Sequence, residues 1–94
     1  MDIDFEWDRE KAEQNFVKHG VAFEEATTVF ADTLSLTITD PLHSEAEERF
    51  VITGLSNKGR QLVVVFTERG ERVRLISARQ ATSGERKKYE EGRE

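Results

Sequence analysis

The chain has 94 residues, of which 36% are hydrophobic. This is enough for one domain over residues 1–94, near the lower size limit of a self-supporting core. The absence of cysteine excludes a disulfide framework and a thiolate metal site. No apolar run approaches the roughly 20 residues of a membrane span, and the acidic start, Met1-Asp2-Ile3-Asp4, does not have the form of a signal peptide. We therefore expect a cytoplasmic protein that does not associate with a membrane.

Charge is divided unevenly along the chain. The net charge of −5 by itself argues against a phosphate-binding protein. Residues 1–56 contain 4 Lys or Arg against 13 Asp or Glu, a net −9, whereas residues 57–94 contain 10 against 6, a net +4. The second half could therefore contact a polyanion, although an ordinary uneven surface would give the same numbers.

Two helices are predicted after a short strand or entry segment at residues 5–7. Asp8 has the chemistry of an N-cap, and the first helix should run from there to about His19. Gly20 follows as the left-handed residue that ends many helices. Apolar residues at helical spacing predict the second helix over about residues 22–31.

The period then changes to that of β-strands. Alternation of aliphatic residues with Ser and Thr predicts a half-buried strand, formed by Leu34, Leu36 and Ile38. Asp40-Pro41 ends this strand. A polar stretch leads into a second strand at residues 49–56, and the loop at residues 57–59 turns the chain.

The last part of the chain predicts the centre of the sheet and a final helix. Residues 61–66 are apolar on both faces and should form a central strand, with the last strand at residues 72–78. Thr82 and Glu85 have the spacing of a capping box that opens a helix to about Glu91. The sequence thus predicts an α+β fold with two N-terminal helices, an antiparallel sheet of about four strands and a C-terminal helix.

Residues spread in order over positions 5–90 form four recognisable blocks. The blocks are Phe5-Glu6-Trp7-Asp8, Lys11-Ala12, Asn15 and Lys18-His19-Gly20-Val21; Phe23-Glu24-Glu25-Ala26, Val29-Phe30 and Asp32; His43-Ser44-Glu45, Glu48-Arg49 and Gly54; and Arg74, Ile76-Ser77-Ala78-Arg79, Ala81, Glu85-Arg86 and Tyr89-Glu90. Any one block is weak, but the ordered set is specific and resembles the BrnT family of bacterial toxins.

The resemblance implies a RelE-like sheet-and-helix fold and RNA cleavage that needs no metal or other cofactor and blocks translation. It also implies a hetero-oligomer with a ribbon-helix-helix antitoxin, through which alone operator DNA would be bound. We expect the acidic first half of the chain or the sheet surface to bind a basic antitoxin, because opposite charge speeds association.

Arginine suits metal-free RNA cleavage, because its planar fork can hold two phosphate oxygens while the 2′-hydroxyl attacks. Arg49, Arg74 and Arg79 lie on predicted strands, where a sheet can hold them rigidly. The alternative for each is a solvent-facing arginine or one paired with a nearby carboxylate.

Proton transfer has several candidates. His19 is a candidate because an imidazole is the usual proton carrier in enzymes, but at a helix C-terminus it could, like Lys18, simply complement the helix dipole. His43 lies in a polar loop and could serve equally well or do nothing. Tyr89 fits a packing anchor on the last helix better than an acid. Two histidines twenty-four positions apart make a poor zinc site.

Together these residues define the expected site. We predict catalytic roles for Lys18, His19, Arg49, Arg79 and Tyr89, RNA-binding roles for Arg60, Arg74, Arg86 and Lys87, and no metal ligands. Gln80 and Ser83-Gly84 stand where the family pattern is often basic, which reduces the charge available to hold phosphate. A non-catalytic chain that binds its antitoxin and strengthens operator repression is therefore the alternative function. A small domain unrelated to RNA is the third reading.

Overall fold

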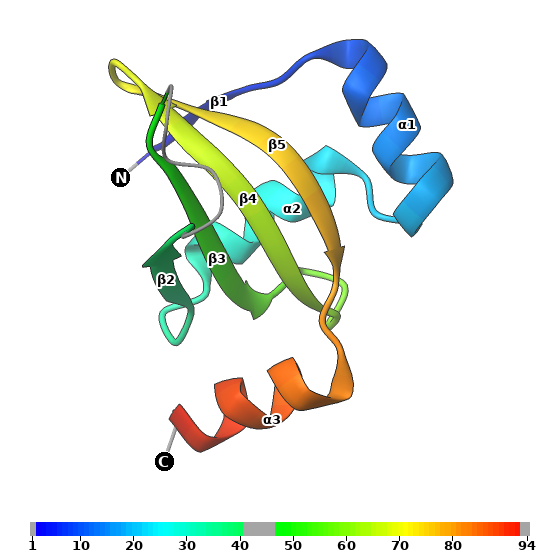
Figure 1. Ribbon diagram of the computed structural model, residues 1–94, viewed down its shortest axis with the longest axis vertical. Coiled ribbons are helices and arrows are strands. Elements are labelled where there is room, and N and C mark those ends of the chain that lie inside the picture. Colours follow the sequence, from blue (N-terminus) through cyan, green and yellow to red (C-terminus); the bar gives the residue numbers. More distant parts are fainter. Residues whose placement is uncertain (1, 41–46, 93–94) are drawn as a thin grey trace.

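The computed structural model describes residues 2–40 and 47–92 as a five-stranded sheet with helices on both sides (Figure 1). The elements in chain order are β1 (Asp4–Glu6), α1 (Arg9–His19), α2 (Phe23–Thr27), the 3₁₀ turn η1 (Thr28–Ala31), β2 (Leu36–Thr39), β3 (Arg49–Leu55), β4 (Gln61–Arg69), β5 (Arg72–Gln80) and α3 (Ser83–Gly92). The predicted α+β order is confirmed.

The strands lie in the order β1-β5-β4-β3-β2, so the predicted central strand is at the centre of the sheet. The prediction of about four antiparallel strands is corrected in two respects. The sheet has five strands in the described residues, and β1 pairs in parallel with β5, with Asp4 opposite Arg72. The short N-terminal segment joins the far edge of the sheet, a long-range pairing that a local sequence pattern does not encode.

The two residues predicted to begin and end the first helix have these roles in the structure. The Asp8 carboxylate accepts a hydrogen bond from the Lys11 backbone N–H at 3.0 Å and caps α1. Gly20 has a φ of 70° and donates its N–H to the Phe16 carbonyl at 2.8 Å, the left-handed ending that favours glycine. The predicted second helix over about residues 22–31 is present, but its last four residues form the 3₁₀ turn η1. At the change from α to 3₁₀, the hydroxyls of Thr27 and Thr28 donate to carbonyls three residues earlier, which offers the backbone an alternative to α-helical bonds.

The main core lies between the sheet and the segment formed by α2 and η1. Its buried members are Val21, Phe23, Ala26, Val29, Ile52, Leu62, Val64, Phe66, Leu75 and Ala78. Aromatic rings extend this core toward the sheet edges, with Phe30 in edge-to-face contact with both Phe5 and Phe66 at centroid distances of 5.0 Å. Helix α3 lies on the opposite side of the sheet, where it leaves part of the surface uncovered.

A single buried aromatic residue anchors α3. Tyr89 is 2% exposed and donates its hydroxyl to the Asp32 carboxylate, which also accepts from the Leu55 backbone N–H at 2.8 Å. Glycine fits closely at position 54, because a Cβ there would lie only 3.0 Å from Asp32 Oδ2 and from Val29 Cγ1, and these atoms would have to move. At the other end of α3, the predicted capping box between Thr82 and Glu85 is present.

The strand predicted from Leu34, Leu36 and Ile38 is present as β2, but the prediction that it is half-buried is wrong. All four residues of β2 are exposed, and the exposed fractions of Leu34, Leu36 and Ile38 are 44%, 46% and 61%. The strand is at the sheet edge, and a groove rather than a close contact separates its aliphatic side chains from α3.

Within the described residues, no helix combines the length and the apolar character needed to cross a membrane.

Candidate active site

A pocket of about 310 Å³ lies at the junction of α1 and β5, which are neighbours at one side of the sheet (Figure 1). It is lined by Lys11, Gln14, Asn15, Lys18, His19, Ile76 and Ser77. The helical residues share one face of α1, because positions three, four and seven apart return to the same side of a helix. The predicted residues Lys18 and His19 are therefore brought together, beside a strand hydroxyl.

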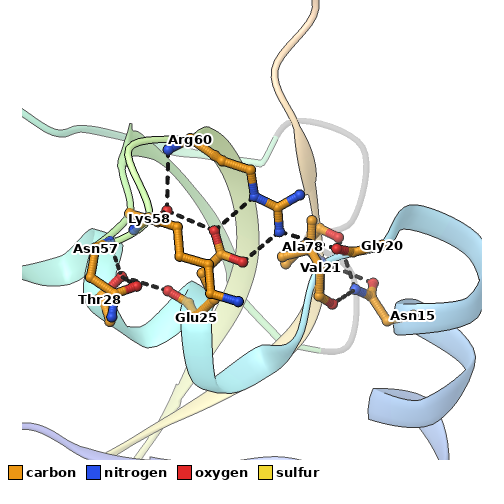
Figure 2. Close-up of polar contacts among 10 residues, drawn as sticks. Asn15, Gly20, Val21, Glu25, Thr28, Asn57, Lys58, Arg60 and Ala78 are labelled. Carbon is orange, nitrogen blue, oxygen red and sulfur yellow. Dashed lines mark hydrogen bonds and ion pairs between the residues drawn. The ribbon is translucent and has the colours of Figure 1, made fainter.

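Asn15 fixes this face of α1 against the edge of β5. Its side-chain amide donates to the Ala78 carbonyl at 2.8 Å and accepts from the Ala78 N–H at 3.0 Å (Figure 2). The same amide nitrogen donates to the Val21 carbonyl at 3.0 Å. Since β1 pairs with positions 72–74 of β5, Asn15 takes over the edge of β5 beyond that pairing.

Arg79 lies on the same face of β5 as Ser77, two residues along the strand, because side chains alternate between faces. Its guanidinium holds Glu85 in a bidentate pair, with Nη1 to Oε1 at 2.7 Å and Nη2 to Oε2 at 2.8 Å. This hydrogen bonding lowers the pKa of Glu85 to about 2 and raises the pKa of Arg79. A carboxylate thus occupies the fork with the geometry that a phosphate would use.

The structure does not bring Arg49 and Arg79 together. In the strand register, Arg79 is opposite Val63, which is opposite Thr53, four residues from Arg49. With about 3.3 Å per residue and about 4.8 Å between strands, their Cα atoms are roughly 16 Å apart. Both face the α3 side of the sheet, but their guanidinium groups lie beside different carboxylates, Glu47 for Arg49 and Glu85 for Arg79.

Arg49 and Arg74 lie in one cross-strand row with Thr67 between them. Arg74 donates to Glu6 at 2.8 Å, and this bond lowers the pKa of the Glu6 carboxyl. The Nε atom of Arg49 is 3.8 Å from a carboxylate oxygen of Glu47. Each of these arginines has the carboxylate neighbour that the alternative interpretation in the sequence analysis required.

Arg60, which the sequence analysis assigned to RNA binding, forms its hydrogen bonds within the chain. Its Nε donates to Glu25 Oε2 at 3.0 Å, and Nη2 donates to the other oxygen of Glu25 and to the Gly20 carbonyl at 3.1 Å (Figure 2). The Ser56 hydroxyl adds a bond of 2.7 Å to the same carboxylate. The side chain of Glu25 is 3% exposed, and its pKa is lowered chiefly by the bond from Arg60. Arg60 therefore ties the β3–β4 hairpin to α2 and to the end of α1.

The three candidates on α3 lie apart from the pocket at α1. Tyr89 is buried against Asp32, which precedes β2, so its packing role is the one that the structure displays. Arg86 lines a different pocket of about 320 Å³ with Gln61 and Gln80, and Lys87 is exposed. His43 lies outside the described residues. Within the described ranges, no group of three or more His, Asp or Glu side chains could hold a metal ion.

The comparison with protein families decides which class of protein carries this arrangement. Residues 7–85 match the family described as the ribonuclease toxin, BrnT, of a type II toxin–antitoxin system. The chain belongs to the BrnT family. The match covers both α1 and β5, so the pocket lies within the part of the chain that defines the family.

A solved BrnT structure has the same architecture. The crystal structure of the ribonuclease toxin BrnT of Brucella abortus matches with a TM-score of 0.64 and 24% sequence identity, over 87% of this chain and 100% of that chain. At this identity the likeness shows a shared fold. Comparison with curated proteins gives no match.

Of the seven residues that line the pocket of this BrnT family member, the sequence predicted only Lys18 and His19 as site residues, and Lys11 and Ser77 are the two others whose chemistry suits RNA cleavage. Lys11 could have been found from its spacing of seven from Lys18, which places both on one helical face. Ser77 lies in a block that carries the family resemblance, but no local pattern indicates that it lines a site, because the pocket forms only when α1 docks on a strand nearly sixty positions later. What the arrangement offers is two ammonium groups, an imidazole and a hydroxyl in one recess, with a guanidinium two residues along the strand.

Proposed function

We propose that the chain is a metal-independent endoribonuclease and that the pocket between α1 and β5 is its active site. The observation that carries the proposal is that Lys11, Lys18 and His19 line one pocket with Ser77, next to Arg79 on the same strand face. Cations oriented in advance toward a phosphate stabilise the charge that develops in the transition state, and this is the largest contribution in many enzymes.

The chemistry follows from RNA itself. The 2′-oxygen attacks phosphorus and the bond from phosphorus to the 5′-oxygen breaks, so one proton leaves the 2′-hydroxyl and one joins the 5′-oxygen. We assign the first transfer to the His19 imidazole and the second to the Lys18 ammonium group, while Arg79 and Lys11 hold the phosphate oxygens. The products are a 2′,3′-cyclic phosphate and a 5′-hydroxyl, and no metal or redox partner is needed.

Glu85 has to be considered in this scheme, because it holds both Nη atoms of Arg79. An RNA phosphate would either replace this carboxylate or approach the guanidinium from its Nε side. The side chain of Arg79 is 41% exposed, so it is accessible from solvent in either case.

The cellular role that we propose follows from the family. Cleavage of RNA would block translation, and a ribbon-helix-helix antitoxin would neutralise the enzyme in a cytoplasmic hetero-oligomer, with operator DNA bound only through the antitoxin. Membership of a type II toxin family supports the partner protein. The RelE-like relationship stays a prediction.

The test is cleavage of total RNA by the purified chain in the presence of EDTA. Removal of a proton-transfer group typically slows a reaction by about 10²- to 10⁴-fold, so His19→Ala and Lys18→Ala should show losses in this range. Arg9→Ala is the matched control, since it removes an exposed cation from the same helix but outside the pocket. Loss of wild-type cleavage on chelation, or full activity in both pocket variants, would contradict the proposal.

One observation favours a second candidate function. Arg79 is already paired with Glu85, and Gln80 provides no further cation beside it. A chain with its main phosphate-binding group so occupied could act only as an antitoxin-binding corepressor. Absence of cleavage by the wild-type chain, with retained antitoxin binding, is the result that distinguishes this candidate.

A further inference from the structure

Among the described residues, β2 is an edge strand with one side of its backbone unpaired. It pairs with β3 on the other side, and the Asp40 N–H donates to the Arg49 carbonyl at 2.8 Å just beyond the strand. Hydrogen-bonded pairs alternate in an antiparallel ladder, and Asp40 is opposite Arg49 in the register that β2 and β3 follow. The backbone groups of Leu36 and Ile38 therefore also point to β3, whereas those of Thr37 and Thr39 point away from the sheet.

The side chains of this edge do nothing to block the addition of another strand. Natural edge strands are usually protected by Lys, Pro, a bulge or a covering segment. Residues 33–39, Thr-Leu-Ser-Leu-Thr-Ile-Thr, contain neither a charge nor a proline, and most have a high tendency to form strands. Their alternation is that of a half-buried strand, yet the chain by itself leaves Leu36 and Ile38 largely exposed. The sequence thus encodes a cover that residues 2–40 and 47–92 do not supply.

An apolar groove continues this surface toward α3. It has a volume of about 270 Å³, and Leu36 and Ile38 form it with Val51 and Val63 on the neighbouring strands. Tyr89 and Lys88 line its α3 side. A strand added beside β2 would extend the sheet, and its inward side chains would continue the apolar row of Leu36 and Ile38.

Charge distinguishes between the occupants that could bind there. Residues 21–48, with β2 in their second half, contain no Lys or Arg and seven acidic residues, namely Glu24, Glu25, Asp32, Asp40, Glu45, Glu47 and Glu48. Among the described residues, two cations lie near the β2 edge and its groove. They are Arg49, whose Nε atom is 3.8 Å from a carboxylate oxygen of Glu47, and Lys88 on the groove wall. A second copy would bring the same acidic stretch and a further net charge of −5, whereas a basic segment would be attracted.

We infer that β2 is the docking edge for the antitoxin, which adds an extended segment with alternate aliphatic and basic side chains as a sixth strand. The inference rests on the proposed function only in taking an antitoxin as the partner. Main-chain hydrogen bonds to Thr37 and Thr39 would provide affinity, and the Leu36–Ile38 row would select the register, as in other complexes formed by strand addition.

The probe is the antitoxin, taken as the small protein encoded beside this chain's own gene and purified with it. Thr37→Pro removes an outward N–H while leaving the β2–β3 ladder intact, because proline is tolerated at such edge positions. Thr37→Val is its matched control, since it keeps the N–H. Ile38→Lys places a charge on the apolar row, and Val17→Lys makes the same change at another exposed aliphatic residue, on α1.

We expect Thr37→Pro and Ile38→Lys each to weaken antitoxin binding at least about tenfold, as the loss of a central interface contact does, while the two controls bind like wild type. Amide hydrogen exchange should slow at Thr37 and Thr39 in the complex. Unchanged binding in both β2 variants, or loss of binding in Val17→Lys alone, would overturn the inference, as would a dimer of the free chain that Ile38→Lys converts to a monomer.

RNA cleavage by the same variants without antitoxin separates this inference from the proposed function. None of the substituted residues lies in the pocket at α1, so cleavage should equal that of wild type. If the wild-type chain cleaves RNA but forms no complex with the antitoxin, the docking edge is wrong and the ribonuclease stands. If the wild-type chain binds the antitoxin through β2 but does not cleave RNA, the docking edge stands and the ribonuclease proposal is wrong.

Discussion

Two arginine–carboxylate pairs, Arg60–Glu25 and Arg79–Glu85, join the sheet region of this chain to its helices, and they differ in what surrounds them. In the Arg60–Glu25 pair, the carboxylate side chain is 3% exposed and also accepts from Ser56. In the Arg79–Glu85 pair, the two side chains are 41% and 36% exposed and the bonds are confined to one end of α3. The same pairing is therefore part of the folded framework in one place and accessible to a competing anion in the other.

The largest effect should come from breaking the buried pair. Arg60→Ala leaves the Glu25 carboxylate buried with Ser56 as its remaining side-chain donor in the described residues. Removal of one partner from a buried pair typically costs about 3–5 kcal/mol, and we expect a loss near the lower end because Arg60 itself is 30% exposed. Urea unfolding followed by circular dichroism measures it. Arg60→Lys is the control that keeps the charge but not the fork, and a change below about 1 kcal/mol in Arg60→Ala would place this pair in the class of surface ion pairs.

The exposed pair should behave in the opposite way. Arg79→Ala should change the free energy of unfolding by less than about 1 kcal/mol, because exposed pairs contribute little. It should nevertheless reduce RNA cleavage by about 2–4 kcal/mol of transition-state stabilisation, the cost of one lost donor to a developing oxyanion. Arg49→Ala, at the other end of the same sheet face, should reduce cleavage less. Equal losses in the two variants would show that the site extends across the sheet.

Acid should weaken the exposed pair over a defined pH window. The pKa of Glu85 in the folded chain is lowered from 4.5 to about 2, chiefly by the hydrogen bond from Arg79. A carboxyl with a lowered pKa stabilises the folded state fully above its unfolded pKa, and this contribution is lost as pH falls from about 4.5 to about 2. Because the pair is partly exposed, the contribution should not exceed about 1 kcal/mol. Thermal unfolding of wild type and Glu85→Gln at pH 6 and pH 3 should show a difference at pH 6 that narrows at pH 3. A constant difference would mean that Glu85 acts through packing.

What the sequence could predict depends on the separation of the interacting residues. The Asp8 cap, the Gly20 ending and the Thr82–Glu85 box are contacts within four residues, and each has a known spacing, so all three were found. The central place of residues 61–66 followed from an apolar run on both faces.

Long-range relations were not predictable in this way. Arg60 and Glu25 are 35 positions apart, and an arginine beside a hairpin gives no sign that a helix will supply its partner. The same holds for the parallel pairing of β1 and for Ser77 in the pocket at α1. The exposure of β2 was missed for a different reason. Its alternation indicates a covered strand, and the docking inference places that cover on a partner rather than on this chain.

The smallest expected effect concerns Gln61, the first residue of β4, which directly follows Arg60 in the chain. Within residues 2–40 and 47–92, its Nε2 atom is a buried side-chain nitrogen without a hydrogen-bond partner, whereas Arg60 has several. An unsatisfied buried donor costs about 1–3 kcal/mol, so Gln61→Met, which keeps the length and removes the donor, should raise the free energy of unfolding by about 1 kcal/mol. Gln80→Met is the control, because Gln80 is exposed and lines the pocket that Gln61 and Arg86 also line. It should leave the free energy of unfolding unchanged. For both variants, the change in the free energy of unfolding is measured from the midpoint of urea unfolding, provided that the m-value is unchanged. A loss of stability in Gln61→Met would mean that the amide has a hydrogen-bond partner in the folded free chain, such as an ordered water molecule.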